Sequence, residues 1–426
     1  MIFLLACTGA DGDAALDSRE AGGGGRTLIL LTLDTVRADH VTGEHMPWLS
    51  ALAAGGLVVP DLATHTWTYP GIGAVLSGRH PSAWGEASWE DQRDEEYPFA
   101  LSPEVPLLAE ILGERGWATA YWSANRIAAD GTGLERGYDS FTLFDEGATP
   151  AAAAEIVAWW EENRALDRLV HLHVNDAHSP YDLHADSCAA EVSAVNDGTC
   201  HWDFVDNNED SLFANLDGRE GSFTPESEDY AACVALIQAA YACEVRRQDD
   251  DLATTWATLE AAGVTTTALV AVVIDHGEAL LDPYTNHGFD PRLPVTAGWA
   301  AFAGPGLSPE QLPVPATQED VVPTLEALLG EDWGQDWTGA DVRTLGSDRV
   351  RTTFYIGEPP GQPRGQVHSA RDTRYHYIRG TTGQCELYDL VADPGELTNL
   401  CDGTEPSKQL LDAVDAQEAA VEGFGG

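Results

Sequence analysis

Lysine is almost absent from this chain of 426 residues: Lys408 is the only one, and arginine supplies the rest of the 22 basic residues. Against them stand 70 Asp and Glu residues, which give a formal net charge of −48. Such a surface repels the nucleic-acid backbone and argues against nucleic-acid binding through a basic face. It also repels an anionic substrate unless salt screens the charge, or a metal ion or arginine supplies local positive charge.

The chain also lacks a complete secretion signal at its amino end. Residues 1–7, MIFLLAC, resemble the end of a bacterial lipoprotein signal in which Cys7 would carry the lipid. This apolar run is too short to span a membrane and has no positively charged start. Either the true translation start lies upstream or the likeness is accidental. The acidic, glycine-rich residues that follow fit a solvated tether, so residues 1–25 are predicted to be a signal remnant and linker.

The C-x-x-C spacing of many zinc sites is missing too. The six remaining cysteines, an even number, therefore favour disulfides and an oxidising, extracytoplasmic compartment. We expect Cys385 to pair with Cys401. Cys233 and Cys243 lie on one predicted helix, about 15 Å apart at 1.5 Å per residue, and should not bridge each other.

Apolar runs that alternate with helical patterns indicate the fold class. Buried strands are predicted at 27–33, 117–124, 169–174, 267–274 and 298–304. Helices are predicted at 47–55, 104–116, 151–165, 231–263 and 320–330. This alternation is typical of an α/β fold with a mostly parallel sheet flanked by helices.

The pattern also suggests a division of the chain. We expect a catalytic α/β domain over 26–335. Its aperiodic segment 187–228 is predicted to be a loop or lid pinned by disulfides, and the alternative is a plain surface insertion. Shorter strands and a final helix predict a small C-terminal α+β subdomain over 336–426.

Polar residues with useful chemistry follow several of these strands. Each has a structural alternative, because an aspartate after a strand often caps a helix and a histidine is often an ordinary core or surface residue. Parallel strands, however, bring their carboxyl ends to one edge of a sheet, where ligands bind. The residues in question are Asp34, Thr68, Asp176, His178, Asp275, His276 and His287.

Carboxylates and imidazoles at one edge are the ligands that a divalent cation requires. A hydroxyl bound to that cation loses its proton readily, so Thr68 could act as an alkoxide nucleophile. If a helix begins near Gly71, its free N–H groups would face a phosphoryl or sulfuryl group.

Seven segments, in order, resemble the sulfatases and the wider alkaline phosphatase superfamily. They are LLTLDTVRADH, WTYPGIGAVLSGRHP, SANRIAADGTGLERGYDSF, HVNDAHSPYD, YACEVRRQDD, DHGEALLDPYTNHG and ELYDLVADPGELTNL. The resemblance implies the alkaline-phosphatase/sulfatase fold. It also implies that Asp34, Asp275 and His276 bind one metal ion together with Thr68, and that His178 and His287 hold the substrate's anionic oxygens or protonate the leaving oxygen.

The sequence departs from the sulfatase pattern at three places. Sulfatases oxidise a cysteine or serine to formylglycine, and Thr68 cannot give that aldehyde. Ile72 stands where many sulfatases keep an arginine, and their active-site lysine has no counterpart. Threonine nucleophiles occur in the phosphate-handling branches, so the resemblance favours a phosphoester over a sulfate ester. The alternative is a degenerate lipoprotein that binds an anionic glycan or surface partner.

The resemblance also suggests how the site is completed. Arg37 and Arg126 are candidates for the missing positive charge beside the substrate. A single divalent ion is expected, with Zn or Mn favoured over Mg or Ca because histidine is a ligand. A second ion at Asp176, His178 and His287 is the alternative to direct substrate binding by these residues. The expected partner is an anionic ester, on a glycan or a lipid head group.

Overall fold

The computed structural model describes residues 25–84, 101–128, 131–179, 181, 183–196, 198–200, 230–280, 287–288, 290–355 and 366–421. Its strands are β1 (Thr27–Leu33), β2 (Leu57–Ala63), β3 (Ala118–Ser123), β4 (Ser140–Leu143), β5 (Arg168–Val174), β6 (Leu269–Ile274), β7 (Ala297–Ala303), β8 (Glu310–Gln311), β9 (Ala316–Thr317), β10 (Arg351–Tyr355), β11 (Val367–Arg371), β12 (Tyr375–Gly380) and β13 (Cys385–Asp389). Its α-helices include α1 (Pro47–Ala53), α2 (Thr68–Ser77), α3 (Leu108–Gly113), α4 (Thr149–Glu162), α5 (Ala185–Val195), α7 (Tyr230–Ala261), α8 (Leu293–Thr296), α9 (Val321–Leu328) and α10 (Lys408–Val421). The predictions of a lipid on Cys7 and an acidic linker lie outside the described residues.

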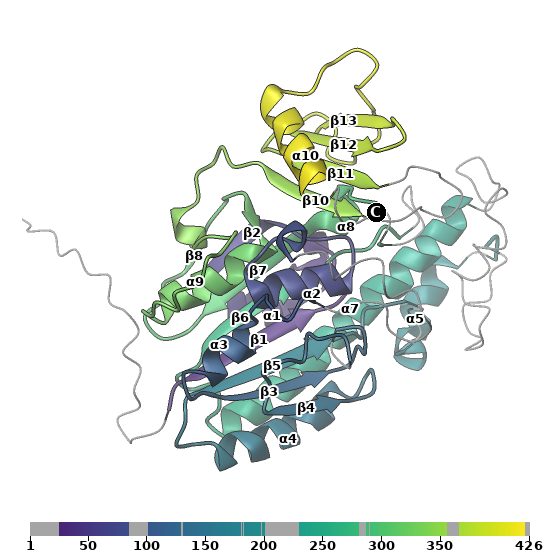
Figure 1. Cartoon of the computed structure of the whole chain (residues 1–426). Helices are drawn as coiled ribbons and strands as arrows, with labels where there is room; N and C mark the ends of the chain where they lie inside the picture. Colours follow the sequence, from purple (N-terminus) through teal and green to yellow (C-terminus); the bar gives the residue numbers. More distant parts are fainter. Residues whose placement is uncertain are drawn as a thin grey trace, which may run out of the picture.

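A nine-stranded sheet forms the centre of the molecule, in the order β4-β3-β5-β1-β6-β7-β2-β8, with β9 paired to β2. The four pairings from β4 to β6 are parallel, and β7 runs antiparallel to both β6 and β2. Figure 1 shows helices on both sides of this sheet. The prediction of an α/β fold with a mostly parallel sheet is confirmed.

Both faces of the sheet are buried, which explains why its strands read as continuous apolar runs. In β1, Leu28 and Leu30 belong to a core shared with α2, α3 and α9. The alternate residues Ile29 and Leu31 belong to a second core shared with α1, α4 and α7. Because side chains alternate along a strand, one heptapeptide supplies both cores.

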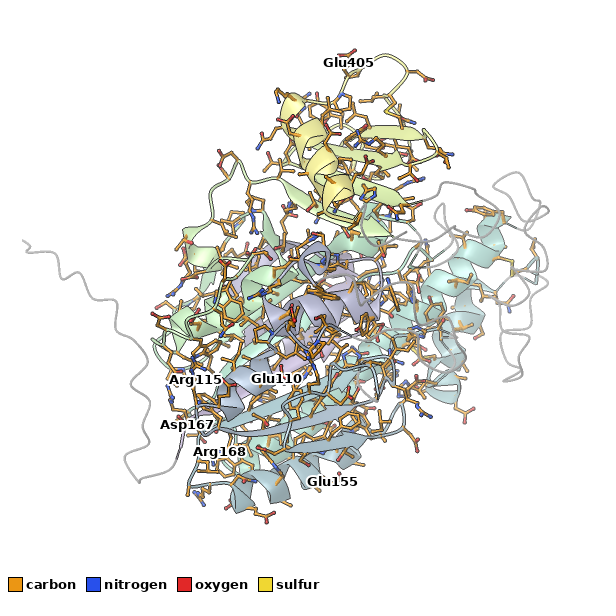
Figure 2. The ribbon with its side chains drawn as sticks, in the orientation of Figure 1. Glu110, Arg115, Glu155, Asp167, Arg168 and Glu405 are labelled. Carbon is orange, nitrogen blue, oxygen red and sulfur yellow. A yellow bond between two sulfur atoms is a disulfide. The ribbon has the colours of Figure 1, made fainter. Side chains whose placement is uncertain are left out.

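An ion pair lies at the amino ends of the parallel strands β1 and β5. Arg26 contacts Asp167 immediately before β1 and β5 begin, with 2.6 Å between Nη2 and Oδ2. Figure 2 labels Asp167 and Arg168 at this end, far from Glu405 in the yellow part of the chain. The opposite, carboxyl ends are the ones that carry the polar residues described below.

A second, antiparallel sheet, in the order β10-β11-β12-β13, is covered by α10 near the C-terminus. Figure 1 shows it beside β2, and two buried arginines make the connection. Arg351 binds the Asp61 carboxylate, and Arg371 donates to the Leu62 carbonyl at 3.3 Å. The expected short strands and final helix are confirmed.

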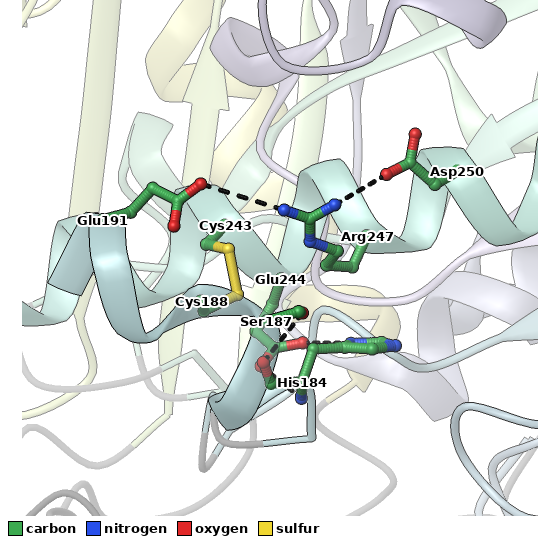
Figure 3. The surroundings of a disulfide bond; sticks show 8 residues. All are labelled: His184, Ser187, Cys188, Glu191, Cys243, Glu244, Arg247 and Asp250. Carbon is green, nitrogen blue, oxygen red and sulfur yellow. Dashed lines mark hydrogen bonds and ion pairs between the residues drawn. A yellow bond between two sulfur atoms is a disulfide. The ribbon is translucent and has the colours of Figure 1, made fainter.

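All six downstream cysteines are paired. Cys385 bridges Cys401 as predicted, and Cys233 and Cys243 bridge other partners, Cys200 and Cys188. Figure 3 shows the Cys188–Cys243 disulfide between α5 and α7.

Further contacts join these two helices. The carboxylate of Glu244 accepts from the backbone N–H and Nδ1 of His184, at 2.8 and 2.6 Å, and Arg247 lies between Glu191 and Asp250.

Several segments differ from the sequence prediction, among them the short elements α8, β8 and β9, which were not predicted. Residues 185–195 form α5, so the segment read as aperiodic begins as a helix; residues 201–229 lie outside the described part. Strand β2 was missed because Pro60 and Asp61 interrupt its apolar run, where its register with β7 is also irregular. Strand β4 was missed because it has only four residues and lies at the sheet edge. In the described residues, no helix is both long and apolar enough to cross a membrane.

Candidate active site

Four neighbouring parallel strands place polar residues at one edge of the large sheet. Asp34 follows β1, Asp275 follows β6, Asn175 follows β5, and Asn125 lies two residues beyond β3. The strands β3, β5, β1 and β6 are adjacent, so their carboxyl ends meet. Asp34 and Asp275 are fully buried there.

Helix α2 brings Thr68 to the same edge. The helix begins at Thr68 itself, three residues before the predicted start, and all ten of its residues are buried. A Cβ on Gly71 would lie 2.7 Å from the carbonyl oxygen of Asp275, so only glycine allows α2 to pack this closely. Gln318 ties the two segments together, since it accepts from the His65 N–H and donates to the Asp275 carbonyl.

Thr35 holds the two aspartates together in an unusual conformation. Its φ is 60°, a value that a β-branched residue rarely adopts and that costs of the order of 1–3 kcal/mol. Its hydroxyl donates to Asp34 Oδ1 at 2.6 Å, and its N–H donates to Asp275 Oδ1 at 3.1 Å. Its carbonyl accepts from Tyr241 at 2.8 Å. Backbone strain maintained by three contacts is typical of a functional site.

Thr68, Asp34, Asp275 and His276 converge on one point. The Thr68 hydroxyl lies 3.3 Å from Asp34 Oδ2 and 3.4 Å from His276 Nε2. The same Nε2 lies 3.4 Å from Asp34 Oδ1 and 3.6 Å from Asp275 Oδ2. His276 Nδ1 donates to the Gly277 carbonyl at 2.9 Å, which leaves Nε2 directed at the two carboxylates.

Burial and mutual contacts shift the pKa values of the ionisable residues in this group. Burial favours the neutral form of each carboxyl, yet hydrogen bonds from His173 and His276 hold the pKa of Asp34 well below its usual value. Burial and the neighbouring Asp34 charge raise the pKa of Asp275 well above its usual value. Burial alone would lower the pKa of His276, but Asp275 and Asp34 raise it to about 9. Asp275 and His276 therefore hold protons more tightly than usual beside the ionised Asp34, and a cation bound there would replace those protons.

The donor set fits a divalent cation. Asp275 Oδ2 is buried and has no hydrogen-bond partner among the described residues. An orphaned carboxylate oxygen of this kind is costly unless an ion completes its coordination. Two carboxylates, an imidazole Nε2 and a hydroxyl are the mixed oxygen and nitrogen ligands that Zn and Mn accept.

His178 and His287 lie beside this group. The ring centroids of His276 and His287 are 4.4 Å apart, and those of His287 and His178 are 5.1 Å apart. His287 Nδ1 donates to Glu278 at 3.0 Å, and His178 Nδ1 donates to the Ser179 carbonyl at 2.8 Å. In both rings, Nδ1 makes the contact with the protein that these distances describe.

A family model named Sulfatase matches residues 26–330, which include Asp34, Thr68, Asp275 and His276. The chain belongs to the sulfatase family.

Solved structures support this fold at low sequence identity. The phosphonate monoester hydrolase of Agrobacterium radiobacter superposes with a TM-score of 0.68 at 15% identity, over 94% of this chain and 96% of that one. The enzyme of the same name from Silicibacter pomeroyi gives 0.66 at 16%, over 93% and 95%. A protein solved with its substrate D-glucosamine-2-N,6-O-disulfate gives 0.67 at 12%, over 93% and 98%. No curated protein matches the sequence.

Three other candidate residues of this sulfatase-family chain take different positions. Asp176 accepts from the Gly147 N–H at 2.9 Å, and it is Glu278 that contacts His287. Burial raises the pKa of Asp176 to about 6. Arg37 pairs with Asp39 at 2.6 Å and donates to the Glu278 carbonyl at 3.1 Å.

Arg126 lines a cavity of about 670 Å³ together with Asn125, Glu146 and Asn175. Asn125 also donates to Asp34 Oδ2 at 2.7 Å, so this cavity opens beside the sulfatase-family site.

The sequence reasoning missed Asn125, His173 and Glu278. His173 lies 3.1 Å from Asp34 Oδ2 and forms a potential ligand group with Asp34 and Asp275. Its signal was available, because two histidines at alternate positions of a buried strand, as in LVHLHV, are unusual in a core. Glu278 had a weaker signal as a buried acid just after Asp275 and His276.

A second group of potential ligands lies apart from the first in this fold. His65, His80 and Glu319 offer atoms within 4.8 Å of one another. Their nitrogens already have protein partners: His65 Nε2 contacts Glu319 at 3.0 Å and Nδ1 contacts Thr353 at 3.2 Å. His80 contacts Ser82 and the Thr352 carbonyl. We interpret this group as a buried polar contact between β10 and the two segments that flank α2, which contain His65 and His80.

Proposed function

We propose that this protein is an extracytoplasmic, metal-dependent hydrolase or transferase of phosphoesters that uses Thr68 as its nucleophile. The observation that carries the proposal is the position of Thr68 Oγ1, within 3.4 Å of both Asp34 Oδ2 and His276 Nε2. Asp34, Asp275, His276 and Thr68 would hold the cation. When bound, it would lower the pKa of the hydroxyl and neutralise charge on the phosphoryl oxygens.

The proposed first step is an in-line displacement. Thr68 Oγ1, after its proton passes to solvent, forms a bond to phosphorus while the bond to the leaving oxygen breaks. A protonated His287 or His178 gives its proton to that oxygen and becomes neutral. Helix α2 begins at Thr68, and the first turn of a helix is where N–H groups bind anions. In the second step, water or an alcohol gives its proton to the histidine left neutral by the first step and forms a bond to phosphorus. The bond between phosphorus and Thr68 Oγ1 breaks, which releases Thr68.

Two observations favour phosphorus over sulfur. Thr68 cannot be oxidised to the formylglycine that the resemblance to sulfatases would require. Two of the structural neighbours are named phosphonate monoester hydrolases, which suggests that this fold accommodates esters of phosphorus. Sulfate esters remain the second substrate class, because the family includes enzymes for sulfated sugars.

The cavity beside Asn125 is the proposed site for the alcohol part of the ester. It contains Arg126, Asp145 and Glu146, so it offers both signs of charge to a glycan or a lipid head group. Three disulfides support an oxidising, extracytoplasmic location. We propose residues 26–335 as the catalytic domain, with 187–228 as an insertion, and 336–426 as the smaller subdomain.

The test is a panel of 4-nitrophenyl esters assayed after metal removal and again with added Mn²⁺ or Zn²⁺. The panel contains the phosphate monoester, bis(4-nitrophenyl) phosphate, the phenylphosphonate and the sulfate. We expect metal-dependent turnover of at least one phosphorus ester and a lower rate on the sulfate. Asp275→Asn, purified in parallel, controls for contaminating phosphatases. Tight metal binding without turnover of any ester would favour the non-catalytic binding protein instead.

A further inference from the structure

A continuous hydrogen-bonded chain crosses the buried face of the large sheet and ends on Asp34. Tyr138 Oη lies 2.8 Å from His171 Nδ1, and His171 Nε2 lies 3.0 Å from Thr32 Oγ1. Thr32 Oγ1 lies 2.8 Å from His173 Nδ1, and His173 Nε2 lies 3.1 Å from Asp34 Oδ2. Thr32, His171 and His173 have no exposed surface.

The β-sheet register produces this chain. Strands β1 and β5 are parallel, with Thr32 opposite His173 and Leu30 opposite His171. Residues two apart on a strand share a face, so both histidines lie on the face that Leu30 occupies. The Tyr121 ring stacks on His171 with 4.0 Å between centroids, which fixes the outer histidine.

The hydrogen-bonding capacity of each group assigns a direction to the chain. An ionised carboxylate only accepts, so His173 Nε2 donates to Asp34 and the other nitrogen of a neutral ring accepts. The single Thr32 proton is therefore donated to His173, which requires His171 Nε2 to donate to Thr32. His171 Nδ1 then accepts from Tyr138. Burial lowers the pKa of His171 well below its usual value, in agreement with a neutral ring.

We propose that this chain makes His173 a positioning residue, which fixes the Asp34 carboxylate in the orientation that a cation needs. His173 then differs from His276, whose Nδ1 is bound to a carbonyl and whose Nε2 is the ligand atom. With Asn125, His173 holds Asp34 Oδ2 from the side of β3 and β5, and Thr35 holds Oδ1. A carboxylate fixed in this way binds a cation without losing further freedom.

The inference rests on one part of the proposed function, namely that Asp34 is a cation ligand. Thr32→Val is the decisive variant, because valine keeps the shape of threonine and removes the hydroxyl that joins the two histidines. Thr32→Ser restores that hydroxyl. Thr255→Val is the matched control, since Thr255 is buried in α7 and its hydroxyl has no hydrogen-bond partner among the described residues.

Two measurements without substrate test the proposal. The first is the Kd for Mn²⁺ or Zn²⁺, by competition with a chromophoric chelator. We expect Thr32→Val to weaken binding by about 10–100-fold, as is typical when support of a metal ligand is removed. Thr32→Ser should be within a few fold of wild type, and Thr255→Val unchanged. If Thr32→Val does not fold, Tyr138→Phe provides a smaller change of the same sign.

The second measurement is long-range ¹H–¹⁵N NMR of metal-free protein labelled at histidine. We expect His171 and His173 each to carry one proton, on Nε2. A proton on His173 Nδ1, or wild-type affinity in folded Thr32→Val, would overturn the proposal. Neither measurement depends on turnover. The role of His173 can therefore be confirmed in a protein without phosphoesterase activity, and it can be overturned in a protein that has this activity.

Discussion

The hydroxyl of Thr68 donates to Oδ2 of Asp34 across 3.3 Å, so the proposed nucleophile and the first buried carboxylate share one hydrogen bond. The contact exists because α2 begins at Thr68 and packs its glycine against the end of β6. It places a hydroxyl where a cation would reach both residues at the usual ligand distance of about 2 Å. The predictions below follow from this geometry.

Asp275→Asn should remove cation binding without unfolding the protein. Asparagine can still accept from the N–H groups of Thr35 and His276, and it removes the repulsion between two buried carboxylates. The metal-free variant should therefore melt no lower than wild type. Wild type should gain about 2.7 kcal/mol at a cation concentration of 100 Kd, and the variant should gain nothing. The check is calorimetry with and without Mn²⁺, with Glu155→Gln, an exposed residue of α4, as the control.

His287→Ala should distinguish leaving groups. A good leaving group such as 4-nitrophenolate needs no proton, whereas an alkoxide does. We expect the loss of kcat to be about 10²–10⁴-fold for an alkyl ester and small for the 4-nitrophenyl ester. Glu278→Gln should give a smaller loss with the same selectivity, because Glu278 orients the ring. Equal losses for both esters would assign His287 to binding rather than to proton transfer.

A disulfide that closes a longer loop should contribute more stability, with a logarithmic dependence on loop length. Loop-closure entropy gives about 4 kcal/mol for Cys188–Cys243 and about 3 kcal/mol for Cys385–Cys401. Replacing each pair by serine and measuring unfolding in urea tests both values. Peptide mapping by mass spectrometry should recover these pairs, and free thiols at Cys385 and Cys401 in oxidised protein would contradict the structure.

Mild acid should destabilise the contact of β10 with the two segments that flank α2, which contain His65 and His80. Burial lowers the pKa of folded His80 to about 4 from the ordinary 6.5. Between these values the unfolded chain binds more protons, so stability is full above pH 6.5 and falls as the pH drops toward 4. Glu319, whose pKa is also lowered despite burial, adds to the loss at lower pH.

His80→Gln should therefore show a shallower decline in unfolding free energy between pH 7 and pH 5. Asp176 acts in the opposite direction, because its raised pKa favours the folded state as the pH falls. Its contribution is common to both proteins and cancels in the difference between their pH profiles. Identical slopes would show that His80 titrates normally in the folded protein.

The sequence predicted the parts of the site that follow directly from strand ends. Asp34 and Asp275 terminate uninterrupted apolar runs, and parallel strands bring such positions together. The sequence did not predict residues whose position depends on the order of the strands in the sheet. His173 contacts Asp34 because β5 lies beside β1, and the LVHLHV pattern does not indicate which strand is the neighbour of β5. The contact of His287 with Glu278, and not with Asp176, was also missed, because the direction of a loop is set by tertiary packing.

The most direct test of the account is the rate of a phosphodiester substrate at saturating Mn²⁺ for wild type, Thr68→Ser and Thr68→Ala. Serine keeps the hydroxyl between Asp34 and His276, so it should retain part of the activity. Alanine removes the nucleophile and should lower kcat by several powers of ten, each worth about 1.4 kcal/mol of barrier. Cation affinity measured in parallel separates lost chemistry from lost binding. Equal rates for Thr68→Ala and wild type would contradict the account, because Thr68 would then be only the first residue of a helix.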